Sequence, residues 1–390
     1  MSEKYDAKNG RPQSDEKEVT LGSFGDISFE EPKKNDTRNL GRRILDRILH
    51  FFFEMVPAIG DRPLEFIRKT IFTLALTTLV LSLTFILNDL VIVPEMNKQT
   101  YEAIQYDPDH PLPPPEDYDG EYPENMLESM KFYYGTNSDT RGYLRFSDTE
   151  KSWLNINYPV MNSDDNDYYL KYDFHHVRNK NGALFFDMQD NLDNANSFNK
   201  NLIIHGHNMA SGQMFAKLNE FLTKRSPAKV TSATTIYLDT LYEQRQYQVF
   251  GVMLMNVRGS DGPPFNYLRN SFANDEDFME YVANIRARSI YDFPDVKIGP
   301  EDELLMLSTC TARSGAKFDD GRLVVLAKKV DFNYRVSEQE LASVKMNNDV
   351  IMPKAWYTNQ GITLHPFYTD ANYTVPNEWT PPTSTTETGN

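Results

Sequence analysis

The chain has 390 residues, of which 40% are hydrophobic, and its formal net charge is −16 at pH 7. It is long enough to bury one sizeable core and to carry appendages. Residues 1–69 hold 13 basic and 13 acidic side chains, whereas residues 94–390 hold 27 basic and 42 acidic ones. So acidic a region argues against nucleic acid or an anionic membrane face as its partner, and it would suit a cationic partner such as an amine.

The N-terminal 69 residues divide into two segments. Residues 1–39 are polar and charged with few aliphatic side chains, so a disordered segment is expected. From Leu40 to Val56, apolar residues such as Ile44 and Ile48 recur at helical spacing with arginines between them. This pattern predicts an amphipathic helix on the inner membrane surface or, alternatively, a helix that docks on a cytoplasmic partner.

Residues 70–93 form the most apolar stretch of the chain, and Thr70 to Leu87 carries no charge. Roughly 20 apolar residues are enough to cross the hydrocarbon core of a bilayer. The stretch begins too far along the chain for a signal peptide, so we expect one uncleaved span in contact with membrane lipid. Arg62, Arg68 and Lys69 flank its N-terminal side, which predicts residues 1–69 in the cytoplasm and the remainder outside the cell. The alternative is a buried core helix.

Residues 94–140 are predicted to connect this span to a folded domain. Gln105 to Glu124 is rich in proline, aspartate and tyrosine, which is typical of a stiff, extended linker. Asn125 to Tyr134 is expected to form a short helix. The segment therefore predicts an extracytoplasmic linker that lifts the next domain off the membrane.

Residues 141–335 contain closely spaced strand-like runs with two helical patterns between them, Gln213–Leu222 and Asp275–Arg288. The spacing is too short for regular βαβ units and predicts a mainly β fold, a closed eight-stranded barrel with inserted helices. Residues 336–390 are expected to be a largely disordered extension, with a docked patch or a lid over a groove as alternatives. The predicted strands are Gly142–Phe146, Leu154–Val160, Ala183–Phe186, Leu202–His205, Thr235–Asp239, Tyr247–Val257, Leu304–Thr309 and Leu323–Val330.

Three residues carry the candidate chemistry. Cys310 is the one cysteine of the chain, so it cannot form an internal disulfide, and it ends an apolar strand. Arg322 opens the next strand, and His207 follows Gly206 at the exit of another. A thiol nucleophile needs a base and a group that stabilises developing negative charge, which His207 and Arg322 could supply. The alternatives are a cysteine that packs as a small hydrophobic residue and an ordinary loop histidine.

These motifs together resemble the sortases. The carrying features are Ser-Thr-Cys at the end of one strand, arginine at the start of the next, and Gly-His-Asn-Met about a hundred residues upstream. Further segments resemble class B of that family, although His205 stands where relatives often have tyrosine. The resemblance covers roughly residues 141–330, and its class B segments are Asn157–Val160, Asp165–Leu170, Gly182–Asp187, Met209–Phe215 and Asn266–Arg269.

The resemblance implies a membrane-anchored cysteine transpeptidase that uses no cofactor and no metal. It would cleave a C-terminal sorting signal of secreted proteins after a threonine and join the new end, through a thioacyl-enzyme, to an amine of a lipid-linked cell-wall precursor. A pilin polymerase that uses a lysine, and a catalytically silent peptide-binding module, are the alternatives. The implied catalytic residues are His207, Cys310 and Arg322, and the implied substrate-binding residues are Asn166, Leu170, Tyr267, Leu268 and Ser308.

Overall fold

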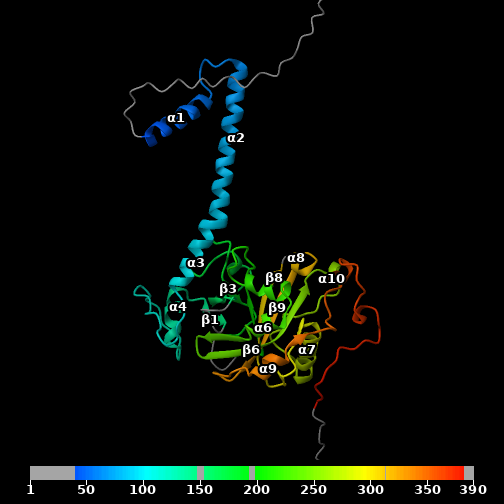
Figure 1. Ribbon diagram of the computed structural model, residues 1–390. Coiled ribbons are helices and arrows are strands. Elements are labelled where there is room, and N and C mark those ends of the chain that lie inside the picture. Colours follow the sequence, from blue (N-terminus) through cyan, green and yellow to red (C-terminus); the bar gives the residue numbers. More distant parts are fainter. Residues whose placement is uncertain (1–39, 147–152, 193–197, 312, 382–390) are drawn as a thin grey trace, which may run out of the picture. The chain divides into compact units, whose positions relative to one another are not determined.

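A computed structural model describes residues 40–146, 153–192, 198–311 and 313–381 (Figure 1). The disorder predicted for residues 1–39 lies outside this part of the chain. The chain divides into two compact units, one that ends at Thr84 and one that begins at Phe85.

The first unit consists of two helices, α1 (Leu40–Met55) and most of α2 (Pro63–Leu87). The helix predicted over residues 40–56 is present as α1, and Ile44, Leu45 and Ile48 on it are about half exposed. No residue of α2 is buried. Five of its hydroxyl groups donate to carbonyls one turn earlier, as from Ser82 to Thr78 at 2.8 Å, so these five polar groups are satisfied within the helix.

One helical run among the described residues is long and apolar enough to cross a membrane. It extends from α2 through a π-helical turn, η1 (Asn88–Ile92), into α3 (Val93–Ala103). The predicted span of residues 70–93 falls inside this run.

Helix α3 packs on the barrel of the second unit, where the sequence predicts only a linker. The ring of Tyr101 contacts Tyr158 edge-on at a centroid distance of 5.0 Å. Asn179 donates to the Asn97 side chain at 2.8 Å, and Gln213 donates to the Pro94 carbonyl at 3.0 Å. The aromatic rings of Tyr101 and Tyr106 are buried, and this apolar contact distinguishes the segment from an extended linker. A short helical stretch follows close to the predicted one, as η2 (Glu128–Met130) and α4 (Lys131–Thr136).

The predicted closed eight-stranded barrel is confirmed. Its strands follow the order β1-β2-β3-β4-β8-β9-β6-β5, in which the pairs β2–β3 and β4–β8 are parallel and the others antiparallel. Each strand matches a predicted run to within a few residues. The strands are β1 (Thr140–Phe146), β2 (Asn157–Met161), β3 (Leu184–Phe186), β4 (Asn201–His205), β5 (Thr235–Thr240), β6 (Gln244–Asn256), β8 (Leu304–Thr311) and β9 (Gly321–Val330).

Helices and short turns connect these strands. Helix α7 (Asp275–Arg288) has the predicted bounds, and the side chain of its N-cap Asn274 accepts a hydrogen bond from Asp277 N at 2.9 Å. Its apolar face is buried, as the helical spacing predicts. The helix predicted over Gln213–Leu222 is shorter, because residues 213–215 are not helical and the next three residues form a 3-10 helix. The remaining connections are η3 (Tyr168–Leu170), η4 (Ala216–Leu218), α5 (Asn219–Thr223), α6 (Pro227–Thr231), η5 (Gly259–Asp261), β7 (Tyr291–Asp292) and α8 (Arg313–Ala316).

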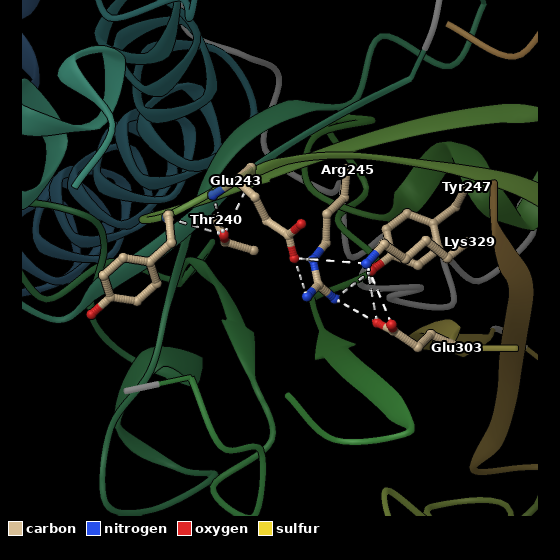
Figure 2. Close-up of polar contacts among 7 residues, drawn as sticks. Thr240, Glu243, Arg245, Tyr247, Glu303 and Lys329 are labelled. Carbon is tan, nitrogen blue, oxygen red and sulfur yellow. Dashed lines mark hydrogen bonds and ion pairs between the residues drawn. The ribbon is translucent and has the colours of Figure 1, made fainter. Parts of the chain in front are cut away.

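A network of hydrogen bonds and ion pairs around the buried Arg245 links the strands at one end of the barrel (Figure 2). Arg245, near the start of β6, donates to Glu303 at 3.1 Å and to the Tyr247 hydroxyl at 3.3 Å, and it also pairs with Glu243. Lys329 reaches the Glu303 carboxylate at 3.4 Å. Glu303 immediately precedes β8, and Lys329 lies near the end of β9. The cluster therefore lies at one end of these two strands, and Cys310 and Arg322 lie at the other end.

The structure differs from the disorder expected for residues 336–390 wherever it describes them. Residues 336–381 contain α9 (Glu338–Ser343), β10 (Lys345–Met346), α10 (Lys354–Thr358) and η6 (Pro366–Tyr368). Met352 and Tyr357 are buried, and so is His365, which pairs with Asp349 at 3.1 Å. Scattered apolar and aromatic anchors thus dock a segment whose average composition is polar. Residues 382–390 lie outside the described part of the chain.

Candidate active site

Cys310 and Arg322 face each other across two neighbouring strands. Cys310 is the penultimate residue of β8 and Arg322 the second residue of β9, and the antiparallel register pairs them directly. Residues paired in this way project to the same side of a sheet. The thiol is exposed, and the guanidinium of Arg322 donates to the carbonyls of Asp320 and Gly321 at 3.3 Å each. No carboxylate of a described residue lies within ion-pair distance of Arg322, so its charge is available to an anionic group.

His207 leaves the same end of the barrel as Cys310. Strands β4 and β8 run parallel with His205 opposite Ser308, and Gly206 N donates to the Ser308 carbonyl at 3.2 Å. His207 and Cys310 each lie two residues beyond that pair, so both residues lie at the same end of the barrel. The Nε2 atom of His207 lies 2.9 Å from the Leu170 carbonyl oxygen. Because a carbonyl only accepts hydrogen bonds, Nε2 carries a proton, and Nδ1 remains as the nitrogen that can gain or lose one.

Asn166 is held in place by a buried carboxylate. Its amide donates to Asp187 Oδ2 at 2.9 Å and accepts from Met188 N at 2.8 Å, which together fix the orientation of the amide. His205 Nε2 lies 3.0 Å from the same Asp187 oxygen. Burial raises the pKa of the Asp187 carboxyl, but the hydrogen bonds from His205 and Gln189 outweigh it and hold the pKa below its ordinary value.

The other predicted substrate residues lie at different depths. Tyr267 and Ser308 are buried. Burial raises the pKa of the Tyr267 hydroxyl, while Ser308 and the nearby charge of Arg322 oppose that rise. Leu170 is half-buried and meets His207 through its main chain, whereas Leu268 is 40% exposed. The structure thus brings Tyr267 and Ser308 close to Cys310 and Arg322, and it brings Leu170 to His207. Asn166 instead contacts Asp187, which also contacts His205 at the end of β4.

The roles of two polar residues at the site, Asp187 and Asn219, were not anticipated from the sequence. Asp187 orients both Asn166 and His205, and the available signal was an acidic residue directly after an apolar strand next to a strand that ends in histidine. Asn219, at the start of α5, donates to the Cys310 carbonyl at 3.4 Å, and no local pattern marks it. Within the described ranges, no group of three or more His, Cys, Asp or Glu side chains is placed to hold a metal ion.

Known proteins resemble this chain over most of its barrel. The sequence profile of the sortase domain matches residues 152–330. Sortase B of Listeria monocytogenes is 30% identical over 212 residues, which are 54% of this chain and 76% of that protein. Sortase B of Staphylococcus aureus is 29% identical over 192 residues, which are 49% of this chain and 70% of that protein.

Solved sortase B structures also match. A Staphylococcus aureus sortase B–substrate complex is 27% identical with a TM-score of 0.45, covering 54% of this chain and 88% of that one. Clostridium perfringens sortase B is 26% identical with a TM-score of 0.45, covering 52% of this chain and all of that one (100%).

The sortase domain and the sortase B relatives show that this barrel is a cysteine transpeptidase. The chain belongs to the sortase family, and its relatives place it in class B of that family.

Proposed function

We propose that this enzyme cleaves a C-terminal sorting signal of secreted proteins after a threonine and joins the new carboxyl end to an amine of a lipid-linked cell-wall precursor. The observation that carries the proposal is the exposed Cys310 thiol directly opposite Arg322, with His207 leaving the same end of the barrel. A covalent intermediate conserves the energy of the acyl bond, so the reaction needs no nucleotide outside the cell.

In the proposed reaction, the Cys310 thiolate attacks the main-chain carbonyl carbon of the threonine. The resulting oxyanion lies against the Arg322 guanidinium, whose planar set of donors suits it. His207 donates a proton to the leaving amine, the C–N bond breaks, and a thioester to Cys310 remains. The second amine then attacks the thioester, His207 accepts its proton, and the Cys310 thiolate is released.

Five residues are proposed to hold the sorting peptide. Asn166 and Ser308 would form hydrogen bonds with it, and their amide and hydroxyl groups are the right chemistry for a peptide backbone. Leu170, Tyr267 and Leu268 would supply apolar contact. Support comes from the contact of the Leu170 carbonyl with His207 and from the effect of the Arg322 charge on the buried Tyr267 hydroxyl.

The reaction is tested with the full-length protein in detergent and a library of peptides that carry threonine at a fixed position. We expect cleavage after that threonine and, when hydroxylamine is added as a simple amine, a hydroxamate at the new end. A wall-derived amine should compete with hydroxylamine. Preference for a pilin lysine would instead indicate the polymerase, and binding without turnover of any peptide would indicate the silent module.

We propose that the protein crosses the cell membrane once, with its N-terminus in the cytoplasm and its catalytic barrel outside. The support is the single apolar run among the described residues and the basic residues at its N-terminal end. Protease added to intact, wall-stripped cells should then remove the region after Pro94 and leave residues 1–69 protected. Digestion of residues 1–69 with protection of the barrel would overturn this orientation.

A further inference from the structure

The C-terminal extension, residues 336–381, is anchored on α7 and β7. Strand β10 pairs with β7, Asn347 donates through its side chain to the Ser289 carbonyl at 2.9 Å, and Ile351 N donates to the Ala287 carbonyl at 2.9 Å. From this anchor the extension reaches two loops of the candidate active site. These are the β6–α7 loop, which carries Tyr267, and the β8–β9 loop, which joins Cys310 to Arg322.

The first connection runs through Arg288, at the end of α7. Its guanidinium lies over the ring of Phe367 in the extension at 5.0 Å and over the ring of Phe265 in the β6–α7 loop at 4.6 Å. Arg288 is only 7% exposed, and no described carboxylate forms an ion pair with it. A buried cation without a counter-ion depends on such aromatic faces and on its hydrogen bonds to Asn284 for stabilisation.

The same path continues from Phe265 to Tyr267. The Phe265 ring stacks on Tyr281 with centroids 5.8 Å apart, and the Tyr281 hydroxyl donates to the Tyr267 carbonyl at 2.6 Å. Tyr267 in turn lies near enough to Arg322 for the charge of that guanidinium to lower the pKa of the Tyr267 hydroxyl. An unbroken series of contacts therefore links Phe367 in the extension to the main chain of Tyr267.

The second connection reaches the β8–β9 loop. Asn359 donates to the Lys317 carbonyl at 2.9 Å. Lys317 has a φ of +69° and Asp320 a φ of +55°, a backbone region that non-glycine residues rarely adopt. Such strain persists only where surrounding contacts enforce it. Asn359 supplies one of these contacts from the extension, and Arg258 supplies another by pairing with Asp320 from the β6–α7 loop.

The close fit of α10 against the β6–α7 loop supports the same interpretation. A Cβ atom on Gly262 would lie 2.7 Å from the Lys354 Cβ, closer than such atoms approach one another, and Gly262 has a φ of +118°. Only glycine allows the loop this backbone conformation and this approach to α10. The extension is thus seated against the loop itself as well as against α7.

We infer that the C-terminal extension is a positioning element of the active site, in which Phe367 acts through Arg288 on the Tyr267 loop and Asn359 acts on the loop between Cys310 and Arg322. The inference rests on the proposed roles of Tyr267, Cys310 and Arg322. Loops held in the productive arrangement before substrate arrives lose less freedom on binding and during the reaction. Phe367 therefore governs KM, because it acts on a substrate-contacting loop. Asn359 governs kcat, because it acts on the β8–β9 loop, which sets the position of Cys310 relative to Arg322.

The test compares variants of the full-length enzyme in peptide cleavage. Phe367→Ala is expected to raise KM about 5-fold, since a desolvated cation–π contact is worth about that factor or more. Phe367→Tyr should restore KM because it keeps the aromatic face, whereas Phe367→Leu should not. Asn359→Ala is expected to lower kcat about 5-fold, the effect of one lost hydrogen bond.

The matched control is Asn347→Ala, which weakens the anchor of the extension on the C-terminal end of α7 but touches neither loop. It should lower the melting temperature and leave kcat and KM unchanged where the protein is folded. Equal kinetic losses in Asn347→Ala and Phe367→Ala, recovery of KM in Phe367→Leu, or kinetics within two-fold of the parent in Phe367→Ala and Asn359→Ala would each overturn the inference. Cleavage by the parent enzyme, measured in every series, separates these outcomes from failure of the proposed function.

Discussion

Replacing Cys310 with alanine is expected to abolish both peptide cleavage and formation of the acyl-enzyme. The thiol is the proposed nucleophile, and removing a nucleophile from a catalytic set costs at least about 10⁴-fold in rate. Because the Cys310 side chain is exposed, the smaller residue leaves no cavity in the core. The free energy of unfolding should therefore stay within about 0.5 kcal/mol of the parent value.

The measurement is intact-mass spectrometry after mixing with peptide, together with a denaturant melt. The parent should gain the mass of the acylated fragment, and Cys310→Ala should gain none while it unfolds at the same denaturant concentration. Cys310→Ser is the conservative companion, because it keeps the size of the side chain but supplies a weaker nucleophile. Near-parental cleavage by Cys310→Ala would refute the transpeptidase mechanism proposed above.

Replacing Arg322 with alanine is expected to lower kcat/KM by about 10²–10³-fold, the usual cost of losing a donor to an oxyanion. The loss should appear mainly in kcat, because the charge it stabilises develops in the transition state. Arg322→Lys should recover only part of the rate, since an ammonium keeps the charge but loses the planar set of donors. Steady-state kinetics of the three proteins measures this order.

Arg245 provides the control arginine. It lies at the opposite strand ends, buried among Tyr247, Glu243 and Glu303 (Figure 2). Arg245→Ala should lower the free energy of unfolding by about 3 kcal/mol, the cost of breaking a buried ion pair, with kcat/KM unchanged where the protein is folded. If Arg322→Ala lost stability instead of rate, or if Arg245→Ala lost rate, the proposed role of Arg322 would be wrong.

The barrel could be predicted from the sequence because its strands are bounded by local signals. The apolar run that begins at Leu304 and the run that ends at Val330 appear as β8 and β9 with little change. Helix α7 was predicted to the residue because three acidic side chains follow its N-cap Asn274 and its apolar spacing is regular. The pairing of Cys310 with Arg322 then follows from two antiparallel strands joined by a short loop.

The remaining features depend on contacts between distant parts of the chain. The extension is polar on average, and its order comes from anchors such as Met352 and Tyr357 that bury only against the rest of the second unit. Likewise, Asp187 has no motif of its own, and its importance appears only when β3 and β4 bring it to His205 and Asn166. Local sequence patterns do not indicate which distant surfaces will pack together, so these features could not be predicted from the sequence.

The hydrogen bond from His207 Nε2 to the Leu170 carbonyl limits the order of events in the proposed reaction. With Nε2 occupied, Nδ1 is the one ring nitrogen left to exchange protons, first with the departing amine and then with the entering one. Two amines cannot share that position, so the first product must diffuse away before the acceptor arrives. The enzyme should therefore follow double-displacement kinetics, with parallel lines in double-reciprocal plots at increasing acceptor concentration.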